Sequence, residues 1–126
     1  MAFTDYLENK LLAHTFSNTA YTSPSTVYVA LYTTAPTDST TGTEVTGGAY
    51  ARQSASFTTS GSATTNAAAI EYPTATAGYG TVVAVAVLDA ASSGNMLAFA
   101  SLDANKTIAT GDVFRIPAGD LDITLN

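Results

Sequence analysis

The chain has 126 residues, of which 46% are apolar and 11% charged, and its formal net charge at pH 7 is −6. This length predicts one domain, residues 1–126, with a modest core. Ten acidic against four basic residues exclude nucleic acid as a direct ligand, since phosphate binding needs clustered Lys and Arg. The chain has no Cys, which excludes disulfides and thiolate chemistry. No apolar run is long enough to cross a membrane, and no signal peptide is expected.

The segment 4–16 (TDYLENKLLAHTF) is the one helix that the sequence predicts. Thr4 or Asp5 can cap its start, and Glu8 follows Asp5 at the spacing of a capping box. His14 lies near the end of the helix, where the dipole favours positive charge.

One face of this helix carries apolar residues at helical spacing. Leu7 and Leu11 are four positions apart, and Tyr6 lies beside them at the start. A helix of this length is marginally stable alone in water. We therefore expect it to pack against its own sheet or against a neighbouring subunit.

Short strands and polar turns follow. Residues 26–33 (TVYVALYT) have two faces that can both pack, which predicts a strand inside a sheet. A long polar loop is expected over 34–48, and its length is typical of loops that are functional, mobile or ordered by a partner. We expect a polar strand over 50–59, a turn over 60–66 and a weak strand over 67–72.

The segment 82–88 (VVAVAVL) predicts a central strand buried on both faces, because it is short, rich in Val and wholly apolar. Residues 89–95 (DAASSGN) have turn chemistry, and 96–102 resumes as the second arm of a hairpin. The residues of this hairpin that we expect to be nearly fully buried are Val83, Val85, Val87, Leu88, Leu97 and Phe99.

The remaining sequence predicts a turn at 103–105 and strands at 113–116 and 121–125. In the last of these, Leu121, Ile123 and Leu125 are expected to point inward. Seven or eight short strands separated by turns predict a mainly β protein. The fold class is an antiparallel β-sandwich or jelly-roll-like domain with one N-terminal α-helix.

Residues with catalytic or ligand chemistry are sparse and scattered. His14 has no second His or Cys with which to bind zinc, and no Gly-x-Ser-x-Gly motif exposes a nucleophile. Asp112, Asp120 and Asp122 could bind calcium or act as acid and base, but Asp in turns and on solvated strand faces explains them better. We expect no catalytic residue, no metal site, no cofactor and no enzymatic activity.

The candidate functional residues are instead interfacial. Tyr21, Tyr50, Tyr72 and Tyr79 lie near strand ends or loops, where amphipathic rings can join interfaces. We expect a dimer or trimer, with the 34–48 loop among its contacts or those to other proteins. The candidate interface residues are Tyr6, Leu7, Leu11, His14, Tyr21 and Tyr50.

Three stretches of the sequence carry a resemblance to a known family. They are residues 1–14 (MAFTDYLENKLLAH), residues 21–31 (YTSPSTVYVAL) and residues 111–125 (GDVFRIPAGDLDITL). The chain resembles, over its whole length, a family of small tailed-bacteriophage virion proteins that are often labelled tail fibre protein. These motifs are structural rather than catalytic, so the resemblance assigns no functional residue.

The resemblance implies a virion structural protein that is assembled in the host cytoplasm. Its partners would be itself, the major capsid protein or other virion proteins. Similar small β-proteins in tailed phages serve as capsid cement, and a compact chain without repeats or heptads favours capsid decoration. The alternative is a tail-fibre or baseplate protein involved in host receptor binding. Hundreds of copies per virion would indicate cement, and a few to a few dozen would indicate the tail.

Overall fold

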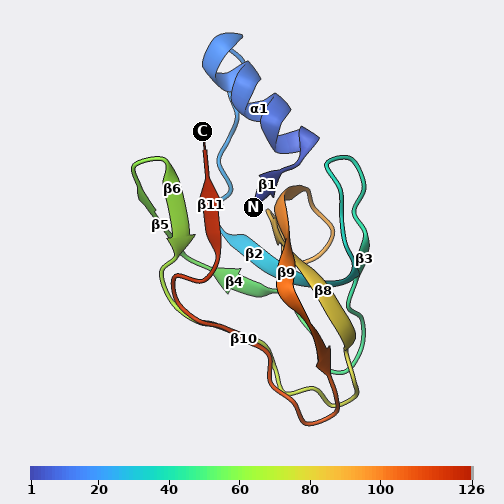
Figure 1. The fold of residues 1–126 in the computed structure, drawn as a ribbon. Coiled ribbons are helices and arrows are strands. Elements are labelled where there is room, and N and C mark those ends of the chain that lie inside the picture. Colours follow the sequence, from blue (N-terminus) through green and yellow to red (C-terminus); the bar gives the residue numbers. More distant parts are fainter. Residues whose placement is uncertain (126) are drawn as a thin grey trace.

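The chain forms a twisted antiparallel β-body with one helix standing off its end (Figure 1). The computed structural model describes residues 1–125. A six-stranded sheet dominates the body. Across this sheet the strands are β1 (Ala2–Phe3), β9 (Met96–Ile108), β8 (Gly80–Leu88), β2 (Val27–Thr34) and β3 (Thr43–Glu44), with β4 (Gln53–Ala55) also paired to β2.

Two small antiparallel sheets complete the body. One pairs β7 (Ile70–Glu71) with β10 (Arg115–Ile116), and the other contains β5 (Phe57–Ser60), β6 (Ala63–Asn66) and β11 (Asp122–Thr124). Their apolar side chains share one core with the large sheet, as Ile70, Ile116 and Leu121 pack in a cluster with Val29 and Val87. This arrangement is sandwich-like, and the predicted mainly β class with one helix is confirmed.

The central strand β8 is buried on both faces, as predicted. Val85 and Val87 belong to the main core, whereas Ala84, Ala86 and Leu88 pack on the opposite face of the sheet with Tyr32 and Met96. The turn between β8 and β9 is also confirmed, since Asn95 donates its backbone N–H to the Asp89 carboxylate over 2.7 Å.

Four of the six residues predicted for the hairpin core are buried, namely Val85, Val87, Leu88 and Leu97. Val83 and Phe99 are only half-buried. Val83 lies where the pairing of β8 with β9 shifts register, and Phe99 pairs with Ala2 on the short edge strand β1. Both positions therefore lack a complete set of neighbours.

The structure corrects two predicted turns. Of the predicted turn at 60–66, residues 63–66 form strand β6, which pairs with both β5 and β11. The predicted turn at 103–105 lies inside β9, which continues to Ile108. There Val82 pairs with Lys106 and Ala84 with Ser101, so the intervening residues form a bulge with the polar chemistry of a turn.

Three predicted strands differ in extent. The segment 50–59 splits, because β4 pairs with β2 whereas β5 pairs with β6. The weak strand at 67–72 shrinks to β7. At the end of the described chain Leu121 is buried and Ile123 half-buried, but Leu125 is 55% exposed, because it lies beyond the last residue of β11.

The predicted helix is α1 (Asp5–Phe16), which begins after the N-cap Thr4. The Thr4 hydroxyl accepts a hydrogen bond from the Leu7 N–H over 3.4 Å and donates one to the Met96 carbonyl over 2.6 Å. This buried threonine thus caps the helix and fastens its start to β9. Within residues 1–125 no helix is long and apolar enough to cross a membrane.

Candidate interaction surfaces

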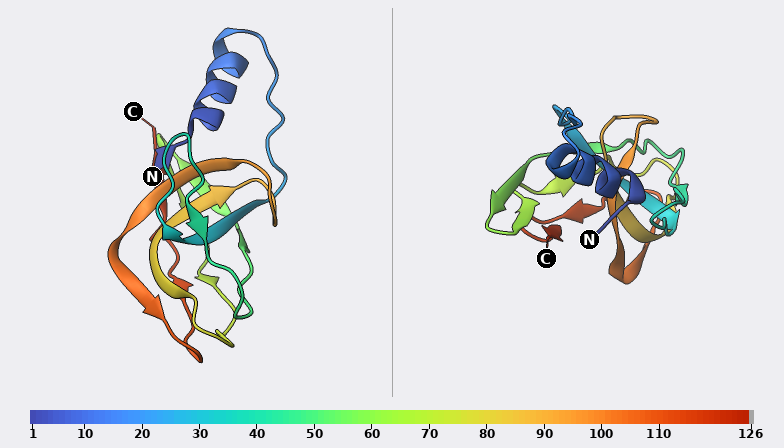
Figure 2. Two further views of the ribbon diagram at one scale, coloured as in Figure 1. Left: turned by 90° about the vertical axis from the view of Figure 1, so that its right-hand side faces the viewer. Right: turned by 90° about the horizontal axis from the view of Figure 1, so that it is seen from above.

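Helix α1 projects from the β-body and buries none of its residues (Figure 2). Tyr6 and Leu7, in its first turn, pack partly against the main core. Further along, Leu12 is 59% exposed and Phe16 is 80% exposed. Leu12 and Phe16 are four positions apart and therefore share one face of the helix. We call these two residues the helix tip.

The base of α1 is held by two neighbours. The Thr4 N–H donates to the Leu97 carbonyl over 3.0 Å, and the Asp5 N–H donates to the Asp38 carbonyl over 3.0 Å. The second of these bonds ties the helix to the loop between β2 and β3, because the predicted loop at 34–48 is interrupted by Thr43–Glu44, which form β3 and pair with β2. That loop is also braced internally, since the Thr40 N–H donates to the Thr37 hydroxyl over 3.1 Å. The loop is therefore ordered by its own chain.

The returning linker lies along the helix. The Tyr21 N–H donates to Nδ1 of His14 over 3.1 Å. The Tyr21 hydroxyl is buried and has no hydrogen-bond partner among the described residues. Burial raises the pKa of Tyr21, and the nearby Tyr6 and Asp89 add to this effect. Tyr21 therefore ties the linker to the later part of α1 through its backbone N–H.

The predicted helical interface residues fall into two groups. Tyr6, Leu7 and Leu11 are half-buried, whereas His14 is exposed. The most exposed apolar pair, Leu12 and Phe16, was not among the predicted interface residues, although their spacing of four residues places them on one helix face. The part that any of these residues plays in an interface stays a prediction.

Tyr50 lies half-buried in a polar cluster inside the body. Its hydroxyl donates to Oε2 of Glu44 over 2.7 Å and accepts the Leu31 N–H over 3.0 Å. Arg52 binds both carboxylate oxygens of Glu44, over 2.9 and 2.8 Å. Its remaining nitrogen Nη1 donates to the Ala90 carbonyl over 2.9 Å. The cluster therefore locks the β8–β9 turn onto β3.

The pKa values in this cluster follow from its contacts. Burial opposes the charge of Glu44, but hydrogen bonds from Arg52 and Tyr50 outweigh it and hold the Glu44 pKa below its usual range. Burial and the bond to Glu44 raise the pKa of Tyr50. Burial also raises the pKa of the neighbouring Tyr32 to about 12. Arg52 and Glu44 thus form a charged pair at neutral pH.

Two tyrosines suggested for an interface belong to the core instead. Tyr72 is 1% exposed and Tyr79 is 4% exposed. Their hydroxyls donate to the carbonyls of Val29 and Pro73, over 2.7 and 2.9 Å. Tyr50 packs between their rings, with centroids 6.1 Å from Tyr72 and 5.8 Å from Tyr79. Rings near strand ends in the sequence therefore converge inside the fold.

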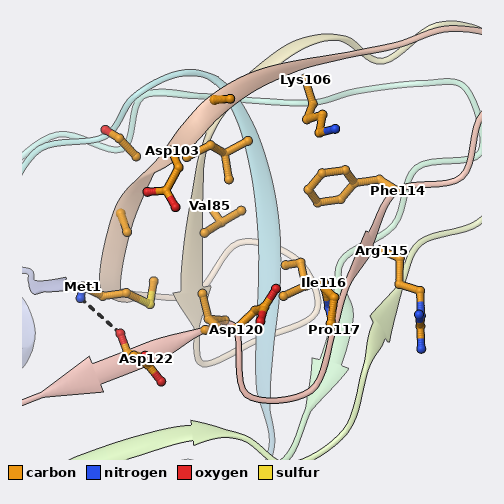
Figure 3. A pocket seen from close by; sticks show the side chains of 15 residues that line it. Met1, Val85, Asp103, Lys106, Phe114, Arg115, Ile116, Pro117, Asp120 and Asp122 are labelled. Carbon is orange, nitrogen blue, oxygen red and sulfur yellow. Dashed lines mark hydrogen bonds between the residues drawn. The ribbon is translucent and has the colours of Figure 1, made fainter.

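A pocket of about 490 Å³ opens between β9 and residues 114–122 (Figure 3). Three buried side chains, Val85, Ile116 and Leu121, line it, together with the half-buried Phe114. The charged residues around it are Asp103, Lys106, Arg115, Asp120 and Asp122. We call this the β9 pocket.

The charges of the β9 pocket are divided between its sides. In Figure 3 Asp103 and Asp122 lie on one side with Met1, Lys106 lies on the other with Phe114, and Asp120 lies between them beside Ile116. The Met1 amino group donates to the Asp122 carbonyl over 3.2 Å. The pocket therefore combines an apolar floor with a rim of mixed charge, in which three carboxylates face Lys106, Arg115 and the Met1 amino group.

The three aspartates considered for chemistry take separate positions. Asp120 and Asp122 are exposed at the pocket rim, and Oδ2 of Asp112 accepts the Ala109 N–H over 2.9 Å in a turn. Among residues 1–125, no three acidic, His or Cys side chains are grouped to hold a metal ion. The described geometry suits packing and recognition.

One family model matches nearly the whole chain. Its description is "Podophage GP4 fiber I protein gp80", and the match covers residues 2–124. No curated protein matches the sequence. The matched range includes α1, the polar cluster and the β9 pocket.

Proposed function

Because the chain belongs to the podophage GP4 fiber I protein gp80 family and is a phage virion structural protein, we propose that it is a building block of a phage fibre. Its β-body is the structural unit, and the helix tip of α1 joins it to neighbouring subunits. The family description is the reason to prefer a fibre over the capsid-decoration role that the compact sequence favours.

The observation that carries this proposal is the exposure of α1. A helix of 12 residues with no buried residue gains little from its own body. Phe16 is 80% exposed to water, and only 11% of the residues of the chain are charged. An exposed apolar face of this kind is typical of surfaces that become covered in an assembly.

The proposed role is non-enzymatic. The buried polar groups of the body have structural partners: Arg52 holds Glu44 and the β8–β9 turn, and Asn66 holds the turn at 117–121. These groups therefore account for rigidity rather than for reactivity.

The proposed location can be tested in a phage that encodes this chain. A short epitope inserted at Gly61 suits labelling, because a Cβ added there would meet no atom within 4 Å. Gold-labelled antibody should then decorate the fibres, with a few to a few dozen copies per virion. Hundreds of labels spread over the capsid would overturn the fibre role and support decoration.

The role of α1 can be tested in the same phage. Changing Leu12→Ser together with Phe16→Ser should sharply reduce incorporation into virions. Val113→Ser is the matched control, since Val113 is also exposed, at 47%, but lies on the body. Equal incorporation of both variants would remove α1 from the proposal.

A further inference from the structure

We propose that the helix tip of one copy docks in the β9 pocket of a second copy, with Phe16 as the apolar anchor. This inference rests on the proposed assembly role of α1 and names its partner as the same chain. It joins two features that are separate within one molecule, an exposed apolar projection and an unfilled apolar pocket.

The helix tip has the shape and chemistry of an anchor. Leu12 and Phe16 lie on one face near the far end of α1, 59% and 80% exposed. An aromatic side chain seated in a desolvated pocket is typical of the residues that dominate binding energy at interfaces. The far end of α1 projects beyond the body (Figure 2), and Phe16 there is exposed, so a second molecule can reach it.

The β9 pocket has a matching floor. Val85, Ile116 and Leu121 are 3%, 8% and 6% exposed, so they form a fixed apolar surface, and Phe114 offers a ring for aromatic contact. A volume of about 490 Å³ is within the range of pockets that enclose a ligand group. Apolar side chains from one helical turn would fit this space.

Charge selects this pairing among the possible contacts between two copies. In a chain of net charge −6, most pairs of surfaces repel each other. Residues 9–37 contain no Asp or Glu, so the outer part of α1 brings no carboxylate to the contact, and Lys10 lies on the same helix, on a different face from Leu12 and Phe16. The carboxylates of Asp103 and Asp120 at the pocket are compatible in charge with this segment.

The opposite side of the pocket complements the end of the helix. The last carbonyl groups of an α-helix lack partners within the helix and carry partial negative charge. Lys106 and Arg115 line the pocket and can donate hydrogen bonds to such carbonyls. The two sides of the rim thus fit the two charges that a docked helix end presents.

The partner must be a second molecule, because Thr4 fixes the base of α1 on β9 and leaves Phe16 exposed in its own copy. A contact between two different surfaces forms a reciprocal pair or a ring where it closes, and an open filament where it does not. A closed pair or ring gives the dimer or trimer that the sequence predicts. One helix end buries a small area, so repetition around the axis is needed for a stable assembly.

Cross-linking tests the contact directly, because the natural chain has no Cys. A Thr15→Cys variant, which keeps the Phe16 anchor, mixed with an Asp120→Cys variant should form a disulfide-linked dimer under mild oxidation. Ser54→Cys replaces Asp120→Cys in the control, since Ser54 is exposed on β4 at the other edge of the sheet from β9. Equal yields from the two mixtures would overturn the inference.

Sedimentation equilibrium of the full chain supplies the second measurement. Phe16→Ser should weaken self-association by about tenfold or more, and so should Asp103→Lys with Asp120→Lys. Val113→Ser should leave it unchanged. A wild-type protein that stays monomeric up to millimolar concentration, or variants that associate normally, would overturn the inference.

The labelling and cross-linking experiments distinguish the two proposals. Gold labels on fibres without any cross-link would refute self-docking alone, whereas cross-linking with labels on the capsid would refute only the fibre role.

Discussion

Strand β8 and helix α1 are both rich in apolar residues, yet their surroundings differ completely. Six of the nine residues of β8 are buried, whereas none of the 12 residues of α1 is. The strand has hydrogen-bonded neighbours at both edges and packed side chains on both faces. The helix is fastened mainly at its first turn. Changes to the body should therefore alter stability, and changes to the outer helix should alter assembly.

A charge placed in the centre of β8 should unfold the body. Val87→Asp would bury a carboxylate at a position that is 3% exposed and lies within the main apolar cluster. The expected loss is several kcal/mol, which is comparable with the whole stability of a small domain of about 5–15 kcal/mol. Thermal unfolding followed by circular dichroism should show an unfolded chain. A normal melting transition would contradict the assigned core.

A smaller loss is expected at Asn66, which is 2% exposed. Its amide donates to the Ala68 and Pro117 carbonyls and accepts the Leu121 N–H over 2.9 Å. Asn66→Ala leaves these groups without a side-chain partner, and should cost about 3 kcal/mol in urea unfolding. Asn105→Ala, at an exposed position in the β9 bulge, should change stability little. Equal losses would contradict the role given to Asn66.

Two glycines with positive φ angles differ in the space around them, so substitutions there distinguish backbone strain from steric crowding. Gly42 and Gly61 have φ angles of 64° and 61°, but a Cβ on Gly42 would lie 2.3 Å from the Thr34 carbonyl oxygen, whereas one on Gly61 would meet nothing. Gly61→Ala should cost about 1 kcal/mol, and Gly42→Ala about 2 kcal/mol or more. Equal melting temperatures for the two variants would show that the 34–48 loop moves freely.

The Glu44–Arg52 pair predicts a dependence on pH. The pKa of Glu44 is lowered in the folded state, so its stabilisation is present above the unfolded value of 4.5 and is lost as the pH falls through the folded pKa. At neutral pH the free energy of unfolding of the wild type should exceed that of Glu44→Gln by about 1 kcal/mol, and this difference should shrink in acid. Urea titrations at several pH values measure it. A difference that does not vary with pH would contradict the ion pair.

The smallest effect on stability is expected at the helix tip. Leu12→Ser with Phe16→Ser changes side chains that already face water, so the free energy of unfolding should shift by no more than about 0.5 kcal/mol. The same variant is expected to lose assembly. A large loss of stability in the isolated protein would mean that the helix tip packs on its own body. The outer helix would then contribute to stability, as β8 does.

Local sequence patterns predicted those elements whose neighbours are close in the chain. The capping of α1 by Thr4 and the β8–β9 hairpin follow from spacing and turn chemistry within a few residues. The bulge in β9 and the strand β6 were missed, because polar residues suit turns, bulges and edge strands alike. Pairing with distant strands decided between them.

The candidate interaction surfaces also divide into features that local sequence predicts and features that depend on residues far apart in the chain. The helix was identified from its sequence, but which of its faces meets solvent depends on where Thr4 attaches to Met96, 92 positions away. The buried hydroxyl of Tyr72 likewise finds its acceptor at Val29, 43 positions away. The β9 pocket joins Val85 to residues around 114–122, which no local pattern connects.

The attachment of α1 between β1 and β2 has a consequence for engineering and for divergence among relatives. These two strands are separated in the sheet by β9 and β8 alone, so the ends of the helical excursion lie about 14 Å apart at ordinary strand spacing. Many segments can bridge that gap, because the entropy cost of closing a loop rises slowly with its length. The stretch from Glu8 to Thr26, which lies beyond the core contacts of Tyr6 and Leu7, should therefore be exchangeable: a different helix or peptide could be displayed there on the same body without rebuilding the sheet.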